Sequence, residues 1–301
     1  MRADEMSERF GVGIGLISCA AGGAAAVATR YLIGSADPFT LAAIRFGGGV
    51  ICLLPLALLL RVRFPLRADW PAVAGLGFMF FGVFFVLYNV ALAHTTVARG
   101  TLALSTLPLM TMVVGAVLRI EPLSVRKTLG ILMAVLGVGA ALVTALKDAP
   151  PGAWRGDLIM VGATLCMALY NVWTRPFIQR SSALGFVTAS MAVGAAALVV
   201  VSALHGGGAA LSRFTTGEWL AAAYLAAGGG ALAFFLWVYA LQYASPSRVA
   251  NTMTINPIVA GLLAVLILHE PITIQLAAGM IAVCAGLFIA TTEPQAKPAA
   301  A

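Results

Sequence analysis

Six polar or amphipathic side chains that interrupt long apolar runs are the groups of this sequence best able to bind a ligand. Arginine can pair with a carboxylate, asparagine can bond to amino and carboxylate groups alike, and an aromatic ring with a polar edge suits planar or amphipathic organic molecules. We therefore expect a binding site for a small organic substrate. The candidate substrate-binding residues are Arg45, Tyr170, Asn171, Trp237, Asn251 and Asn256.

Each candidate also has a structural interpretation. Arg45 lies about seven residues from one end of its run, so the sequence favours snorkelling to the interface or bonding to carbonyls at a helix end. Asparagine within a membrane can also join helices. Substrate contact is favoured for Asn251, and the two roles stay open for Asn256. An aromatic belt at the headgroups explains the tyrosine and tryptophan at least as well as ligand binding does.

The elements that must position these groups are membrane-spanning helices. Of 301 residues, 61% are hydrophobic and 10% are charged, with a mean hydropathy of +0.99, whereas soluble domains are roughly 45–50% apolar and 25% charged. The apolar residues fill the runs instead of alternating, which favours helices over a barrel. Ten runs are expected to be spans, near 11–33, 38–60, 70–93, 97–118, 125–146, 157–178, 184–204, 218–241, 247–268 and 273–291.

The chain repeats itself. The segment 91–108, followed by Glu121-Pro122, matches the segment 240–257, followed by Glu270-Pro271, at a constant offset of 149 that also pairs Phe85 with Phe234. Five spans per half is an odd number, so the halves must enter the membrane from opposite sides. We predict an all-α transmembrane bundle of ten helices made of two inverted five-helix repeats, residues 1–148 and 149–301.

Charge predicts the orientation of this bundle. With the N-terminus inside, twelve lysines and arginines lie on the cytoplasmic side and five lie outside. Both termini are therefore expected to be cytoplasmic. The net charge of +7 is explained by topology, and no basic patch interleaved with aromatics calls for a nucleic acid.

Two prolines and two glutamates have mechanical interpretations. Pro108 and Pro257 lie inside the fourth and ninth runs and are expected to kink those helices, in a structural or a transport-related role. Glu121 and Glu270 each precede a proline, and an acidic group there would meet the positive end of the following helix. They are expected to organise the starts of the fifth and tenth spans.

The sequence offers little for other chemistry. All eleven acidic residues, Asp157 among them, lie at or beyond the ends of runs, so no buried carboxylate is expected to relay protons. The motifs HExxH and GxSxG are absent, no run holds paired aspartates, and the four cysteines lack CxxC spacing. We expect no enzyme activity, no cofactor and no metal.

The duplicated unit, Arg45 in its AAIRF context and the paired Pro and Glu-Pro positions resemble the EamA branch of the drug/metabolite transporter superfamily. The resemblance implies a central cavity lined mainly by spans 1 to 4 and 6 to 9, with spans 5 and 10 more peripheral. It also implies a transporter, most often an amino-acid or metabolite exporter. Two inverted repeats can exchange conformations, so alternating access is the expected mechanism. Import of a vitamin or nucleoside-like cofactor, and a non-transporting scaffold, are the alternatives. Fifteen arginines against three lysines suggest a bacterial inner membrane, and we expect a functional monomer.

Overall fold

The computed structural model describes residues 3–119 and 149–270, with isolated positions between 125 and 143 and between 274 and 285. This part of the chain is helical and holds eight helices long and apolar enough to cross a membrane. The eight correspond to spans 1 to 4 and 6 to 9 of the sequence prediction. The predicted spans 125–146 and 273–291, with Glu121, Pro122 and Pro271, lie outside the described residues or only touch them at isolated positions.

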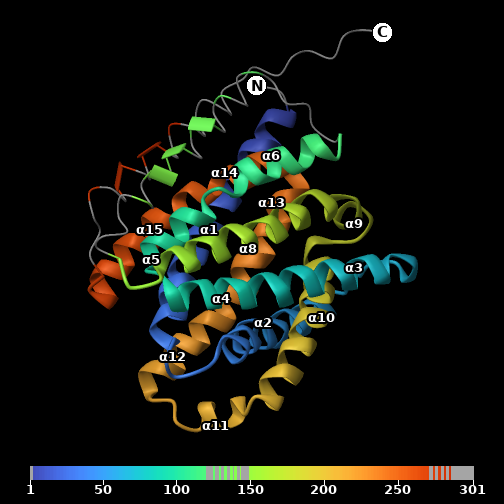
Figure 1. The fold of residues 1–301 in the computed structure, drawn as a ribbon. Helices are drawn as coiled ribbons and strands as arrows, with labels where there is room; N and C mark the ends of the chain where they lie inside the picture. Colours follow the sequence, from blue (N-terminus) through green and yellow to red (C-terminus); the bar gives the residue numbers. More distant parts are fainter. Residues whose placement is uncertain are drawn as a thin grey trace.

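The first half contributes four spans (Figure 1). They are α1 (Ala3–Leu32), α2 (Pro38–Leu59), a third span made of α3 (Trp70–Gly77), the π-helix η2 (Phe78–Phe84) and α4 (Phe85–His94), and a fourth made of α5 (Val97–Leu104) and α6 (Leu107–Val117). A short 3-10 helix, η1 (Arg67–Asp69), precedes α3.

The second half contributes four more. They are α8 (Ala153–Trp173) with α9 (Arg175–Arg180), α10 (Ala183–Leu204), a third made of α12 (Thr216–Tyr224), the π-helix η3 (Leu225–Leu232) and α13 (Ala233–Tyr243), and a fourth made of α14 (Pro246–Asn251), η4 (Thr252–Thr254), α15 (Ile255–Leu263) and the π-helix η5 (Ala264–Leu268). The short helix α11 (Gly207–Leu211) joins α10 to α12.

Local sequence signals set the helix starts. Asp37 accepts hydrogen bonds from the backbone N–H groups of Phe39 and Thr40, at 2.9 and 3.1 Å, and Pro38 occupies the first turn of α2. Thr215 and Glu218 form a capping box at the start of α12. These caps satisfy backbone donors that lipid could not.

The same irregularities recur in both halves. When the halves are aligned at the offset of 149, the π-helix η2 overlaps the π-helix η3. The regular α-helical hydrogen bonding of the third span is therefore interrupted at an equivalent place in each half. The fourth span of each half is also interrupted: a turn at Ser105 and Thr106 precedes Pro108, and the 3-10 segment η4 precedes Pro257. A helix interrupted at mid-span is typical of transporter binding sites.

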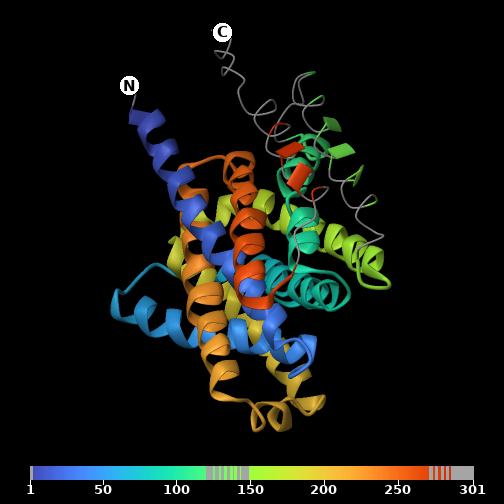
Figure 2. The same cartoon turned by 90° about the vertical axis from the view of Figure 1, so that its left-hand side faces the viewer.

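The two halves pack against each other extensively. Helix α1 contacts α13 and α15, α2 contacts α10 and η3, and α4 contacts α8. Figure 2 shows α1 running beside the second-half helices α12, α13 and α15. Glycine permits a close approach of α2 and η3, since a Cβ on Gly230 would lie 2.2 Å from the carbonyl oxygen of Arg45.

Candidate functional site

A cavity lies inside the bundle, where the helices of the two halves meet. It is bordered by α1, α2, η2, α4, α5 and by α8, α13, η4 and α15. Its free volume is about 40 Å³, room for about three water molecules. The lining residues are Ser18, Cys19, Gly22, Arg45, Phe84, Phe85, Tyr88, Leu104, Met167, Ala233, Phe234, Trp237, Met253 and Asn256.

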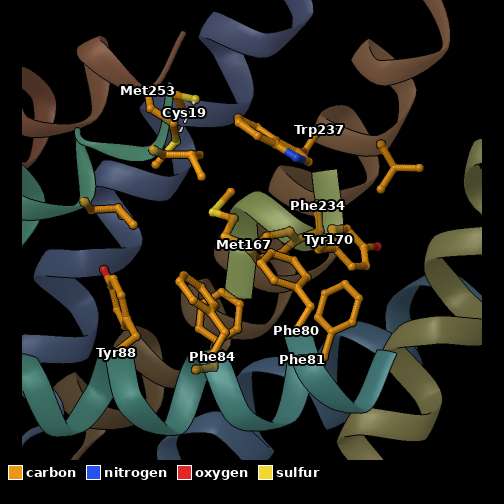
Figure 3. Close-up of a cluster of buried hydrophobic side chains, with 14 of the residues drawn as sticks. Cys19, Phe80, Phe81, Phe84, Tyr88, Met167, Tyr170, Phe234, Trp237 and Met253 are labelled. Atoms are coloured by element: carbon orange, nitrogen blue, oxygen red, sulfur yellow. Dashed lines mark hydrogen bonds between the residues drawn. The ribbon is translucent and has the colours of Figure 1, made fainter. Parts of the chain in front are cut away.

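Most of the cavity wall is aromatic or contains sulfur. In Figure 3, Tyr88 and Phe84 rise from one side toward Met167, Cys19 and Met253. The rings of Phe85 and Phe234 meet edge to face with centroids 5.3 Å apart. These two phenylalanines are the pair that the offset of 149 matched in sequence, so the repeat places equivalent rings side by side.

Arg45 is the one charged residue that lines the cavity. Its side chain is buried, with 4% of the residue exposed. Nε and Nη2 donate to the carbonyl oxygen of Gly229 at 3.1 and 3.0 Å, and Cζ lies 4.7 Å from the centroid of Phe85 and 5.5 Å from that of Phe234. Nη1 makes no hydrogen bond within the described part of the chain.

The expectation that Arg45 snorkels to the interface is therefore wrong. The bond to a carbonyl was expected, but its acceptor lies in the π-helix η3 within another span and not at a helix end. Aromatic faces and this carbonyl replace part of the guanidinium's hydration, so the cation can stay inside the bundle. Sequence spacing could not show this, because the acceptor is 184 residues away.

Trp237 also borders the cavity, and Asn171 fixes its position. The indole Nε1–H donates to Oδ1 of Asn171 at 2.9 Å, and both residues are buried. Asn171 and Tyr170 do not line the cavity themselves. Tyr170 stacks on Phe80 with ring centroids 4.2 Å apart. These aromatics lie in the core of the bundle and do not form a belt at its surface.

The two asparagines of the ninth predicted span are placed differently. Asn256 borders the cavity and is buried; its Nδ2 donates to the carbonyl of Cys19 at 3.4 Å, and its Oδ1 has no hydrogen-bond partner among the described residues. Asn251, the last residue of α14, is half-buried and is not among the lining residues. The structure thus joins Arg45, Trp237 and Asn256 at one cavity and leaves Asn251 outside it.

Helix α1 supplies lining residues that sequence reasoning missed. Ser18 Oγ donates to the carbonyl of Ala233 at 2.7 Å, and Cys19 Sγ lies 3.2 Å from Thr252 Oγ1 and 3.3 Å from Met253 Sδ. Single small polar residues in an apolar run give no distinguishing signal. The offset between Phe85 and Phe234 was the usable signal, since it marked equivalent positions in both halves.

One acidic residue contradicts the expectation that no carboxylate is buried. Asp157, the fifth residue of α8, is 6% exposed, accepts a hydrogen bond from Thr95 Oγ1 at 3.0 Å and forms an ion pair with Arg99. Its place near a span end was predicted correctly, but α5 packs over it. Proximity to a span end therefore did not imply solvent.

Glu270 meets the start of a helix in the first half, while the start of the tenth predicted span, which it was expected to organise, lies outside the described residues. Its Oε2 accepts the backbone N–H of Val97, the first residue of α5, at 3.0 Å, and Oε1 pairs with Arg30 Nε at 3.2 Å. Arg30 Nη1 also donates to the carbonyl of Leu92 at 2.8 Å. The carboxylate thereby ties α1, α5 and the end of η5 together at one end of the bundle.

No three His, Cys, Asp or Glu side chains converge on a possible metal position in the part of the chain that the structure describes. The only charged group at the cavity, among the described residues, is a cation. The side chains around the cavity can offer an organic molecule ionic, polar and aromatic contacts.

The chain is similar in sequence to proteins named as transporters and in fold to a solved structure. The model of the EamA-like transporter family matches residues 9–143 and 154–292, one match per half. Two similar proteins of Bacillus subtilis, the uncharacterized transporters YyaM and YetK, are each 26% identical, over 87% and 92% of this chain and 87% and 86% of their own. An uncharacterized transporter of Archaeoglobus fulgidus is 22% identical over 89% of this chain and 93% of its own. A solved crystal structure shares the fold with a TM-score of 0.72 at 22% identity, covering 94% of this chain and 96% of that one.

Proposed function

Because the chain belongs to the EamA-like transporter family, we propose that it is a secondary transporter that moves a small organic metabolite across the bilayer by alternating access. The observation that carries the proposal is the cavity between the halves, bordered by equivalent residues of both repeats such as Phe85 and Phe234. Two similar halves can exchange conformations, which exposes one central site to each side in turn. We propose ten spans, with residues 1–148 and 149–301 as the repeats.

The size of the cavity assigns the conformation. A volume of about 40 Å³ cannot hold an amino acid, since ligand pockets are about 300–1,000 Å³. The described conformation is therefore contracted. Substrate enters when the halves move and the cavity widens toward one face.

The burial of the ion pairs differs between the two ends of the bundle and indicates which end opens less readily. At the end of the bundle where α1 finishes, the side chains of the Arg99–Asp157 pair are 2% and 8% exposed and those of Arg30–Glu270 are 26% and 13% exposed. At the opposite end, Arg180 and Arg248 pair with Asp69 and Glu8, but both arginines are more than 40% exposed. Exposed pairs contribute little, so the end that holds Arg30 is the more firmly closed one.

We also propose an orientation in the membrane, a substrate class and a direction of transport. With both termini in the cytoplasm of a bacterium, the firmly closed end faces outward, which suits a transporter that loads from inside. Export of an amino acid or related metabolite, by a monomer with no nucleic-acid partner, is the first choice. Import of a vitamin or nucleoside-like cofactor is the alternative, and a non-transporting scaffold is the remaining one.

Flux across reconstituted liposomes tests the proposal. The purified chain is inserted into vesicles loaded with a panel of radiolabelled amino acids, organic acids and nucleosides, and efflux is compared with that from protein-free vesicles. Transport predicts saturable, substrate-selective efflux. Efflux no faster than from protein-free vesicles, across the whole panel, would leave the scaffold interpretation.

A further inference from the structure

We propose that the substrate is a small organic carboxylate with an apolar, aromatic body, and that Arg45 Nη1 binds its carboxylate. The inference rests on the proposed transport function and names the substrate class of the same cavity. It does not require the substrate to carry an amino group.

The first step is the charge of the cavity. Arg45 takes part in none of the four ion pairs of the described residues, and no acidic residue lines the cavity. Aspartates and glutamates that could have balanced it are engaged elsewhere: Asp157 pairs with Arg99, and Glu270 with Arg30. A cation buried inside a membrane bundle without a counter-ion is costly. The cavity therefore favours a ligand that brings a negative charge.

The second step is the geometry of the guanidinium. Nε and Nη2 of Arg45 both donate to the carbonyl oxygen of Gly229. The ring of Phe85 covers the guanidinium, with Cζ 4.7 Å from the ring centroid. Nη1 is the nitrogen left without a hydrogen bond, on a side chain that borders the cavity. The fold fixes Nε, one N–H of Nη2 and the aromatic face of the guanidinium, and the hydroxyl of Tyr88 lies near the group. The two N–H groups of Nη1 are therefore held ready for an oxygen of the ligand.

The third step concerns the rest of the ligand. Phe84, Met167 and Trp237 form apolar walls that match an aromatic or branched aliphatic body. The Oδ1 of Asn256 is a buried acceptor without a partner, so it can accept from an ammonium group but supplies no charge. An ammonium group is thus tolerated at this site, while the carboxylate is what the cation requires.

Three compounds with one benzyl body separate these roles. L-phenylalanine carries both charged groups, 3-phenylpropionate carries the carboxylate alone, and phenylalaninamide carries the ammonium alone. Binding to the detergent-purified full chain is measured by calorimetry and thermal unfolding, at constant ionic strength in a chloride-free buffer. We expect the first two compounds to bind and the amide to bind at least about tenfold more weakly.

The variant Arg45→Gln tests the residue. It should weaken binding of both carboxylates at least about tenfold and leave binding of the amide unchanged or stronger. An equal loss for all three compounds would assign Arg45 a purely structural role. If this variant fails to fold, Asn256→Ala serves: it should remove any advantage of phenylalanine over 3-phenylpropionate while 3-phenylpropionate still binds.

Several results would overturn the proposal. One is that the amide binds as well as the carboxylates, and another is that none of the three compounds binds. A third is that chloride alone reproduces the stabilisation and the organic anions add nothing, which would make the site a structural anion site. Efflux of neutral or cationic compounds alone from liposomes would support the transport function but contradict the proposal that the substrate carries a carboxylate. Binding of carboxylates without any flux would support the carboxylate site but contradict the transport function.

Discussion

Arg45 in α2 binds the carbonyl oxygen of Gly229 in η3, through Nε at 3.1 Å and Nη2 at 3.0 Å. The contact joins a span of the first half to a π-helix of the second, directly beside the cavity. Gly229 and Gly230 allow it, since neither adds bulk between the two helices. Any movement of the halves must therefore carry this contact along or break it.

Alanine at Gly230 should destabilise the protein. The added Cβ would lie 2.2 Å from the backbone carbonyl oxygen of Arg45, which no side-chain rotation can relieve. We expect a loss of about 1–3 kcal/mol, as for other overpacked sites, seen as a lower melting temperature in detergent. Gly75→Ala is the matched control, because nothing lies within 4 Å of its Cβ; equal melting of the two variants would refute the close contact.

The pair Trp237 and Asn171 should behave as one unit. Asn171→Leu leaves the buried indole N–H without its acceptor, at a cost of about 1–3 kcal/mol, and Trp237→Phe leaves the amide oxygen unpaired. The double variant should be less destabilised than the sum of the singles, by about 0.5–3 kcal/mol. Unfolding of all four proteins in denaturant measures this coupling. Strict additivity would mean that the bond at 2.9 Å contributes nothing.

The two asparagines of the ninth span should differ in their effect on substrate. Asn256 lines the cavity and Asn251 does not, so Asn256→Ala should raise the KM for a transported substrate that carries an ammonium group several-fold more than Asn251→Ala. Initial rates in liposomes, normalised to the amount of inserted protein, give both values. The opposite order would place the substrate at the α14 end of the interrupted helix.

The sequence predicted the eight described spans and the equivalence of the two halves, because hydropathy and a constant offset are both visible along the chain. The environment of Arg45 was not predictable, because its acceptor and its aromatic neighbours come from spans 3 and 8. Burial of Asp157 was missed for the same reason: α5 covers it, and only packing shows that. Local spacing cannot reveal partners that tertiary structure brings together.

The ion pair of Glu270 and Arg30 should hold one end of the bundle closed. Glu270→Gln removes the charge yet keeps a similar shape, so that end should open more often. The native Cys19 reports opening, because it is 2% exposed and lines the cavity. With Cys52, Cys166 and Cys284 replaced, labelling of Cys19 by a membrane-impermeant thiosulfonate from that end should become several-fold faster. Asp69→Asn, at the opposite end, is the control and should not accelerate labelling from the Arg30 end.

The same single-cysteine protein tests alternating access most directly. Impermeant reagent is applied from one face of the membrane or the other, in right-side-out and inverted vesicles, and the fraction of Cys19 labelled is followed by mass spectrometry. A central cavity that opens in turn to each side predicts labelling from both faces, with Glu270→Gln shifting the balance toward the Arg30 end. Labelling from neither face, or from the same single face in both proteins, would contradict the account.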